Sequence, residues 1–586
     1  MFRKLIVPTL VLLLGGLAAA QDLTKLLPEE TFLALGMQDL EGASDKLKDF
    51  SAEFERLDVL GALTALAGSG SVSGGAGSGG AGSGTGSGGV ASAVLSPDER
   101  QALESLGSLE VLGQEAWIAL SASSFSPLPA LTLVTRVTPE GAEKVQALLD
   151  KAETEGVETL EESGATFYQL PLSGVEPLQV VAYSLTDDLL ALSTNPDELR
   201  GVLRRYKGAD EPNFETAEGY KATLQKLQEG TFYSFFDYAR IAEVAAPYTQ
   251  NLGFDPLVKR LSQAFTTAGA VGGAVQLTGD GLTTEGLQAL DQTGGDTSLY
   301  TLLSADTAAT TDVAVPEKAL NFSATAFNWS GWYDYLNELA LSVPELGGDL
   351  DSLILSFTGL NLRESIFGWA GDQLVTVTTG LSGAAEPGVP SENLLGEAVY
   401  LIKTTNAAAA ERGLGALLQN ISRVANSMSD PQGGSGQPQR SQETLEGVDV
   451  TRFEVAPGTT ILYAVSDGYA LIGTSEGAMT AALTAQTEGS RDDLFGGVPD
   501  SATSYTYADD QTTFQNLAQT LSSQIQTAAG MSGAANLDFD AVEKASNVAE
   551  KFLSFVATRL TDSTSYSERK DGSIRSHSET AVTWSE

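Results

Sequence analysis

The chain of 586 residues contains no cysteine and a single histidine, His577. Without cysteine there are no disulfide bonds, no thiolate ligands for zinc and no cysteine nucleophile. One histidine cannot supply the histidine sets of the usual zinc and iron sites. The composition therefore excludes thiol catalysis and most transition-metal chemistry, and we expect no catalytic, cofactor-binding or metal-binding residues.

Basic residues are also scarce. Thirty-three Lys and Arg face 76 Asp and Glu, so the formal net charge is -43. A surface of this charge repels nucleic-acid phosphates and anionic lipid headgroups, and we expect neither as a partner. Acidity keeps an exported protein soluble and favours contact with basic proteins. Whether the acidic surface binds calcium stays open at this stage.

The N-terminus has the features of an export signal. Arg3 and Lys4 precede an apolar run over residues 5–17, and Ala18-Ala19-Ala20 provides the small residues of a cleavage site. The run is too short to span a bilayer, which needs about 20 residues. We therefore predict a signal peptide over residues 1–20, no transmembrane segment after its cleavage, and export to the periplasm or the cell surface.

Low-complexity segments interrupt the remaining chain. Residues 68–89 consist almost entirely of Gly, Ser and Ala, which is typical of a flexible tether. Residues 430–442 form a shorter segment rich in Gly, Gln and Pro. We interpret both segments as insertions within folded units.

An internal repeat organises the chain. Residues Val181, Tyr183 and Leu185 alternate as on one face of a strand, and an offset of 280 leads to the similar set Ile461, Tyr463 and Val465. A turn follows each set at residues 186–188 and 466–468, and a second strand then leads to a helix N-cap candidate, Asn195 or Ser475. We predict a first repeat over residues 21–297 and a second over residues 298–586.

The expected fold class is α+β, with two tandem copies of a unit in which amphipathic helices cover a mostly antiparallel sheet. Each copy is expected to have six or seven strands, joined mainly by hairpins, with helices on one face. Asn195 and Glu198 have the spacing of a capping box. The expected long helices are residues 139–155, 239–267, 513–528 and 541–553.

Three stretches resemble a bacterial family described as domain of unknown function 3352. They are the Leu-Pro-Glu-Glu-Thr opening at residues 27–31, the Leu-Gly-Gln-Glu stretch at residues 112–115, and the run at residues 463–475. The resemblance covers nearly all of the chain after residue 20. It implies an exported, envelope-associated protein of unassigned activity, and it supplies no catalytic residues.

One motif points to catalysis. Residues 473–477 match the Gly-x-Ser-x-Gly nucleophile elbow, and His577 lies downstream in the order that α/β-hydrolases use. However, a tight hairpin places the preceding strand in an antiparallel pair, whereas the elbow belongs to a parallel sheet. The repeat has Asn195 at the position of Ser475, and asparagine is no nucleophile. We therefore favour Ser475 as a helix N-cap over Ser475 as a nucleophile.

Two further clusters have alternative interpretations. Asn536, Asp538, Asp540 and Glu543 offer spaced oxygen ligands for calcium, but they lack the spacing of an EF-hand, and an aspartate there also starts a helix. The aromatic residues of 329–335 suggest either an exposed anchor for a partner or glycan, or a helix face in the core.

The leading functional hypothesis is a non-catalytic cell-envelope protein that acts as a scaffold or accessory of a larger surface assembly, with an envelope protein as its partner. The alternative is a periplasmic carrier of a lipid or other hydrophobic ligand, held between helices and sheet. A serine hydrolase centred on Ser475 ranks third.

Overall fold

The computed structural model describes most of the chain after residue 22. The described residues are 23–38, isolated positions between 43 and 57, 112–122, 129–152, 157–171, 180–249, 255–309, 313–343, 348–380, 396–429, 440–456, 459–488, 495, 497–518 and 539–584. The predicted signal peptide and the predicted tether at 68–89 lie outside them. So do residues 430–439 of the predicted loop, whereas residues 440–442 belong to a strand, β14.

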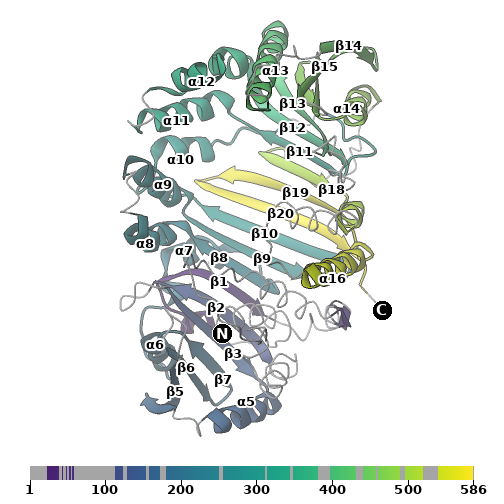
Figure 1. Ribbon diagram of the computed structural model, residues 1–586. Helices are drawn as coiled ribbons and strands as arrows, with labels where there is room; N and C mark the ends of the chain where they lie inside the picture. Colours follow the sequence, from purple (N-terminus) through teal and green to yellow (C-terminus); the bar gives the residue numbers. More distant parts are fainter. Residues whose placement is uncertain are drawn as a thin grey trace, which may run out of the picture.

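The architecture is a mixed α/β fold around one large sheet, whose twenty strands in the described residues all pair in antiparallel fashion (Figure 1). The strands before residue 297 are ordered across the sheet as β4 (Glu158–Glu162), β5 (Ala165–Pro171), β6 (Val180–Thr186), β7 (Leu189–Ser193), β3 (Ala130–Val137), β2 (Leu112–Ser121), β1 (Thr31–Gln38), β8 (Phe232–Asp237), β9 (Ala270–Leu277) and β10 (Gly281–Ala289).

Strand β10 pairs with β20 (Ser573–Val582), which continues the sheet into the strands after residue 297. From there the order is β20, β19 (Leu560–Lys570), β18 (Ser504–Ala508), β11 (Asn321–Ala326), β12 (Ala370–Gly380), β13 (Glu397–Thr404), β17 (Tyr469–Gly473), β16 (Thr459–Ser466), β15 (Val448–Ala456) and β14 (Arg440–Leu445).

The antiparallel sheet confirms the expected pairing, but the expected number of strands was too low. In the part of the chain that the structure describes, ten strands lie on each side of residue 297, not six or seven. The additional strands were not predicted because their residues lack a clear alternation of apolar and polar side chains. Strand β9 contains Gly272 and Gly273, and β14 is almost entirely polar, so pairing to neighbours rather than local pattern holds them in the sheet.

Buried clusters lie on both faces of the sheet, in contrast to the expectation of helices on one face. Trp117 and Ile118 are neighbours on β2, so their side chains point to opposite faces, and each belongs to a separate buried cluster. Leu401 and Ile402 on β13 likewise point to opposite faces and belong to separate buried clusters. The prediction was wrong because short strands with apolar residues on both faces were taken for one-sided strands.

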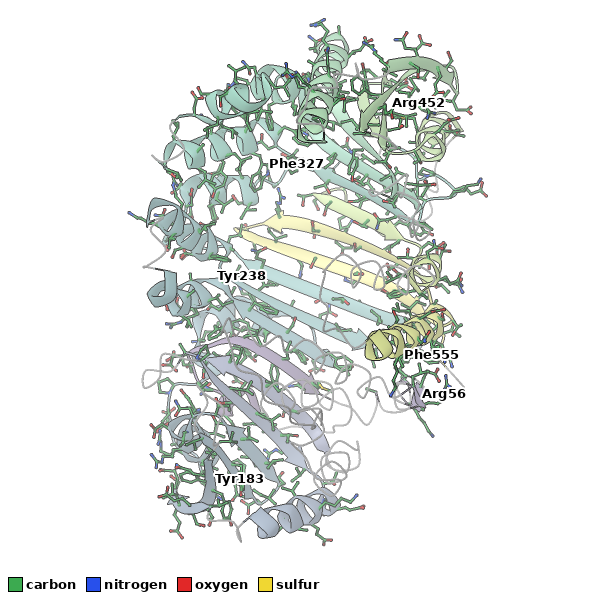
Figure 2. All side chains as sticks on the ribbon, in the orientation of Figure 1. Arg56, Tyr183, Tyr238, Phe327, Arg452 and Phe555 are labelled. Atoms are coloured by element: carbon green, nitrogen blue, oxygen red, sulfur yellow. The ribbon has the colours of Figure 1, made fainter. Side chains whose placement is uncertain are left out.

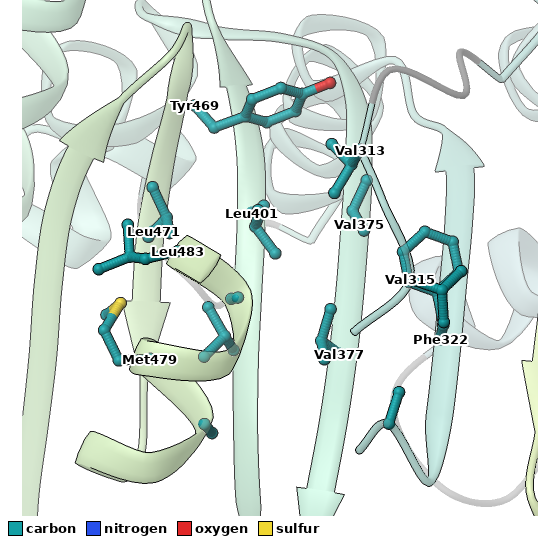
Figure 3. Packing of buried hydrophobic residues seen from close by; sticks show 14 of the residues in the cluster. Val313, Val315, Phe322, Val375, Val377, Leu401, Tyr469, Leu471, Met479 and Leu483 are labelled. Atoms are coloured by element: carbon teal, nitrogen blue, oxygen red, sulfur yellow. The ribbon is translucent and has the colours of Figure 1, made fainter. Parts of the chain in front are cut away.

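Helices cover these clusters on different faces in the second half of the sheet. Helix α14 (Glu476–Glu488) packs Met479 and Leu483 beside Leu471, in a buried cluster that also includes Leu401 and Val375 (Figure 3). Helix α13 (Ala407–Ser429) covers the other face, where it buries the cluster around Trp369. In the first half, α6 (Pro196–Tyr206) packs on the face of Trp117.

The remaining helices line the ends of the strands. Helices α8, α9, α10, α11 and α12 follow one another along one edge of the sheet, while α5 and α16 lie toward the other (Figure 1). Their bounds are α5 Pro139–Ala152, α8 Tyr238–Thr249, α9 Asp255–Ala268, α10 Thr297–Leu303, α11 Trp329–Leu341, α12 Leu350–Thr358 and α16 Phe539–Ala557.

The helices at 139–155 and 541–553 are therefore confirmed with shifted ends. The single helix expected over 239–267 is two helices, α8 and α9, and the helix expected from 513 is described only over 510–518. No helix of the described residues is both long and apolar enough to cross a membrane.

The two predicted hairpin turns are confirmed. Asp187 and Asp467 adopt positive φ angles of 52° and 47°, and Gly468 follows with 81°. Two-residue hairpin loops require this left-handed conformation, which Gly, Asn and Asp adopt at the lowest cost. The turns fix the registers of β6 with β7 and of β16 with β17.

Helix α6 begins as predicted at an asparagine cap, although the capping box is not formed. The Asn195 side chain accepts a hydrogen bond from the Asp197 amide at 3.0 Å. The Asn195 amide donates to the Ser193 hydroxyl at 3.1 Å instead of to Glu198. Glu198 turns inward, where burial and, to a lesser extent, the charge of Glu30 raise its pKa, against a smaller opposing effect of Arg205.

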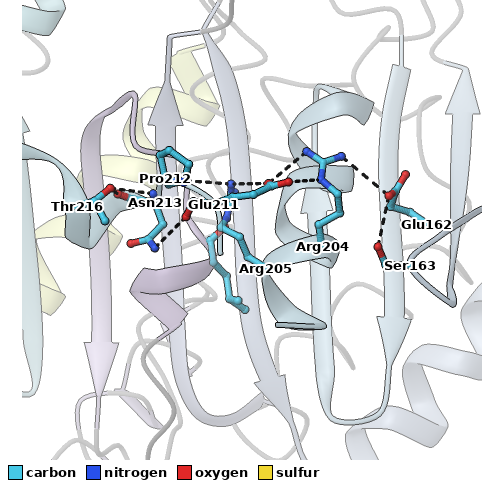
Figure 4. A network of polar contacts seen from close by, with 9 residues as sticks. Glu162, Ser163, Arg204, Arg205, Glu211, Pro212, Asn213 and Thr216 are labelled. Carbon is cyan, nitrogen blue, oxygen red and sulfur yellow. Dashed lines mark hydrogen bonds and ion pairs between the residues drawn. The ribbon is translucent and has the colours of Figure 1, made fainter. Parts of the chain in front are cut away.

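Two arginines near the end of α6 bind neighbouring segments of the same chain (Figure 4). Arg204 Nε donates to Glu211 Oε1 at 2.7 Å, and Arg205 donates to the Leu26 carbonyl through Nε at 3.0 Å and Nη2 at 2.7 Å. Burial lowers the pKa of Arg205. Arg204 thus joins the helix to the segment that follows it, and Arg205 joins it to the segment before β1.

We predict that E198Q stabilises the protein at neutral pH. The pKa of Glu198 is higher in the folded chain than in the unfolded chain, so ionisation of this carboxyl favours unfolding. The native chain therefore loses stability as the pH rises above the unfolded pKa of Glu198, about 4.3. Thermal unfolding should therefore show a higher midpoint for E198Q at pH 7 and no difference near pH 3. D197N, at an exposed neighbouring position, is the control and should not stabilise. An equal gain at both pH values would contradict the assignment.

Candidate functional site

Ser475 acts as a helix cap. Its hydroxyl accepts a hydrogen bond from the Ala478 amide at 3.1 Å, and its carbonyl accepts one from the Met479 amide at 3.1 Å. The preceding strand, β17, pairs in antiparallel fashion with both β13 and β16. The prediction of an N-cap is confirmed, and the parallel sheet of a nucleophile elbow is not formed here.

His577 lies far from this serine. Its strand, β20, is separated from β17 by six strand spacings of about 4.8 Å, or roughly 29 Å. The His577 ring instead contacts Tyr566 and lies 3.2 Å from Glu579 Oε1. A proton cannot pass directly between groups so far apart, so these residues do not form a Ser–His pair.

Substitution tests the two roles of Ser475. As an N-cap, S475A should lower the free energy of unfolding by about 1 kcal/mol, since a capping side chain is lost. N195A at the cap of α6 is the matched variant and should cost a similar amount. The native chain should not react with a fluorophosphonate probe. Labelling that S475A abolishes would establish a nucleophile.

The aromatic cluster on α11 belongs largely to the interior. Tyr333 is buried and its hydroxyl donates to Asp351 at 2.5 Å, while Trp329 packs against Phe327 and Phe367. Of the two interpretations left open by the sequence, the core interpretation describes Tyr333 and Trp329. Spacing along a helix could not distinguish them, since it does not show which face meets the sheet.

The candidate calcium ligands cannot be assembled into a site. Asn536 and Asp538 lie outside the described residues, and Asp540 falls in the first turn of α16, which agrees with a helix start near this position. In the part of the chain that the structure describes, no three His, Asp or Glu side chains are grouped so that they could hold a metal ion.

An apolar groove crosses the first half of the sheet. It has a volume of about 280 Å³ and lies over β2, β1, β8, β9 and β10. The pairs Leu35–Ile118, Met37–Phe232 and Phe232–Val275 stand directly opposite one another across neighbouring strands. Opposite residues point to the same face, so these side chains form one apolar surface. The sequence did not indicate this groove, because it depends on how five distant strands pair.

A second apolar feature lies on the helical edge. Five large hydrophobic side chains on α9, α11 and α12 are between 40% and 58% exposed. We call them the apolar ridge, and they are Leu261, Phe265, Leu336, Leu341 and Leu355. Helix α10 packs between α9 and α11, and α11 packs on α12, so the ridge helices are neighbours. The i,i+4 spacing of Leu261 and Phe265 was visible in the sequence, but their exposure was not.

Comparisons with solved structures found distant matches. Crystal forms I and III of TP0453 each share 11% sequence identity with the chain, with TM-scores of 0.23 and 0.24. Each match covers 49% of this chain and 85% or 86% of the other. No curated protein matches the chain.

The family comparison confirms the family that the sequence resembles, and the stretches at 112–115 and 463–475 lie within the matched residues while 27–31 lies before them. The model described as "Protein of unknown function (DUF3352)" matches residues 88–547, which is most of the chain. The match includes strands β2 to β18 and the capped helices α6 and α14, whereas β1, β19 and β20 lie outside it. The chain therefore belongs to the DUF3352 family of proteins of unknown function.

Proposed function

We propose that this chain is an exported, non-catalytic protein of the cell envelope that binds a partner protein through the apolar ridge, as a scaffold or accessory of a larger assembly. The observation that carries the proposal is the exposure of the ridge. Seven large hydrophobic side chains of the described residues are exposed, and five of them lie on the neighbouring helices α9, α11 and α12. Several large apolar side chains exposed on neighbouring helices favour an interaction surface over scattered single exposures.

The proposal of export rests on the N-terminal pattern of Arg3, Lys4 and the apolar run before Ala20. The absence of catalysis is proposed from the roles of the two candidate residues. Ser475 caps a helix, and His577 lies beside Glu579 and Tyr566.

A protein fits the ridge better than an anionic membrane surface does. The net charge of -43 opposes approach to anionic lipids, whereas a protein can place apolar or basic groups opposite the ridge. Fully burying one leucine contributes about 1.5–3 kcal/mol, so a few ridge residues suffice to anchor a partner.

We also propose that the chain contains two tandem copies of one ten-stranded unit, with residues 21–297 and 298–586 as the copies. Strand order supports the duplication. Each strand of the first set corresponds to the strand numbered ten higher, and the two orders are identical when each is read from its outer edge to β10 or β20. Strands β10 and β20 would then be equivalent strands that pair with each other across a pseudo-two-fold axis.

Register supports the same proposal. Tyr233 pairs with Gly36 and Ala274 in the first set, and Tyr505 pairs with Ala324 and Tyr566 in the second. The series continues without a shift to Glu285 and His577, which stand directly opposite each other. Independent sheets would not be expected to share the order and the register of ten strands.

Native mass spectrometry of the chain purified gently from its own envelope tests the proposed function. We expect a second protein at fixed stoichiometry. The variant L336S/L341S/L355S should weaken that complex at least about tenfold, because it removes several apolar contacts. The control Y400S/I421S changes exposed apolar residues outside the ridge and should retain the partner. A purely monomeric chain, or a complex insensitive to the ridge variant, would contradict the proposal.

The second candidate function is the transport of a hydrophobic ligand, which the groove over β2, β1, β8, β9 and β10 favours. In that case the same measurement would show bound acyl-chain material and no partner protein. V275E would place a charge in the groove and release the ligand, while the ridge variant would retain it. The two functions therefore give opposite results with the two variants.

A further inference from the structure

A second pocket, in the other half of the sheet, carries an inference independent of the ridge. It has a volume of about 420 Å³ and lies where the ends of β11, β12 and β19 meet the start of α11. Figure 2 labels Phe327 on its wall, between the helical edge and the strands. Its lining includes the side chains of Arg569 and Trp329 and, at an exposed position, Asp372.

Arg569 is a cation without an acidic partner among the described residues. Its Nη1 donates to the Ala305 carbonyl at 3.0 Å, and its Nε is buried and without a hydrogen-bond partner among the described residues. Burial lowers its pKa, and no carboxylate acts against that effect. Asp372 lines the same pocket but forms no ion pair with Arg569. A guanidinium that loses water without gaining a carboxylate is unusual in a chain with more than twice as many acids as bases.

Trp329 adds a second unsatisfied donor to the wall. Its indole Nε1 is buried and likewise has no hydrogen-bond partner in the part of the chain that the structure describes. Buried N–H groups are nearly always paired in folded proteins. Arg569 and Trp329 both line this pocket, so two donors without an acceptor lie close to it.

The first half of the sheet shows that packing does not require an arginine. The pair Leu277–Leu282 beside the β9–β10 turn corresponds to the pair Arg569–Ile574 beside the β19–β20 turn. Leu277 packs against the apolar cluster of Met37 and Ile118. A leucine is therefore compatible with this position in the sheet, and the arginine needs a different explanation.

We propose that this pocket binds the carboxylate group of a small acidic ligand, with the Arg569 guanidinium as its charge partner and the Trp329 indole as a further donor. Arginine presents several N–H groups in a planar fork that matches a carboxylate. Asp372 at the exposed rim repels a second negative charge, which favours a monoanionic carboxylate over a dianionic phosphate.

The test uses the indole N–H signals of the folded chain in a ¹⁵N NMR spectrum, with sodium acetate as the probe. The chain has five tryptophans, and W329F identifies the signal of Trp329. We expect acetate to shift that signal saturably, with a dissociation constant in the millimolar range, and sodium chloride of equal ionic strength not to shift it.

Three variants make the result decisive. R569L copies the leucine of the first half and should weaken acetate binding about tenfold or more, whereas R569K keeps the charge and should bind with intermediate affinity. D372N removes the rim charge and should tighten binding about two- to threefold. A shift that persists undiminished in R569L, or no saturable shift in the native chain, would overturn the proposal. A stronger response to inorganic phosphate than to acetate would overturn the assignment of a carboxylate.

Discussion

Replacing Gly36 by alanine is expected to destabilise the first half of the sheet by about 3 kcal/mol, because the site is overpacked by a single methyl group. A Cβ at residue 36 would lie 2.5 Å from Cδ2 and Cε2 of the Trp117 ring. That ring cannot move aside easily. It is 2% exposed, it stacks on Tyr233, and its Nε1 donates to Glu115 at 2.9 Å.

The second half of the sheet shows what relieves the clash. There Ala324 occupies the position that corresponds to Gly36, and it pairs with Val375 where Gly36 pairs with Trp117. In a W117V background, G36A should therefore cost less than about 1 kcal/mol, which corresponds to a coupling of about 2 kcal/mol between the two sites. W117V alone should cost about 3 kcal/mol, because it removes most of a buried ring.

Urea denaturation of the four proteins of this cycle measures the coupling. The midpoint should fall strongly for each single variant, and the double variant should lose little more than W117V, with no change in the slope. G286A, on β10, is the control, because an added Cβ there would meet the Ser576 hydroxyl rather than an aromatic ring. Additive costs of G36A and W117V would show that the ring does not determine the need for glycine.

Local chemistry was predictable from the sequence. The turns at Asp187 and Asp467 and the caps at Asn195 and Ser475 depend on neighbours within three residues, and the structure confirms each of them. The same short range explains the failure at Glu198. Ser193 takes the amide that a capping box would use, and only the fold brings that hydroxyl into place.

Features that depend on distant pairing were not predictable. The apolar groove combines residues of five strands that lie between positions 31 and 289, and the pocket of Arg569 combines chain segments more than 260 residues apart. No local pattern marks Arg569, which lies in a polar strand between Glu568 and Lys570. Its lack of an acidic partner becomes visible only once β19 is placed next to β18 and α10.

Glu115 illustrates how a residue can be noticed in the sequence without its role being known. It closes the Leu-Gly-Gln-Glu stretch, and the structure buries it to 2% exposure. Its carboxylate accepts hydrogen bonds from the Leu23 amide at 3.2 Å, from Gln38 Nε2 at 3.2 Å and from Trp117 Nε1 at 2.9 Å. It therefore joins the start of the described chain to β1 and β2.

We expect E115M to lower the free energy of unfolding by about 3 kcal/mol or more. Methionine fills a similar volume but accepts no strong hydrogen bond, so three donors would lose an acceptor, and each buried unsatisfied donor costs about 1–3 kcal/mol. E115Q keeps one carbonyl oxygen and should cost clearly less than E115M. E158M, at an exposed position on β4, should change stability by less than about 0.5 kcal/mol.

The measurement is urea denaturation followed by the fluorescence of the tryptophans, among which Trp117 contacts the altered side chain directly. If Glu115 serves as the acceptor for this junction, the order of stability is native, then E115Q, then E115M. Equal losses for E115Q and E115M would instead mean that the negative charge itself is required, since the two variants differ in hydrogen bonding but share its loss. Gln373 is buried at the position of β12 that corresponds to Glu115, and its side-chain oxygen accepts a hydrogen bond from the Tyr469 hydroxyl at 2.9 Å. A neutral amide therefore satisfies a donor at this position of the second half, and we expect E115Q to be more stable than E115M.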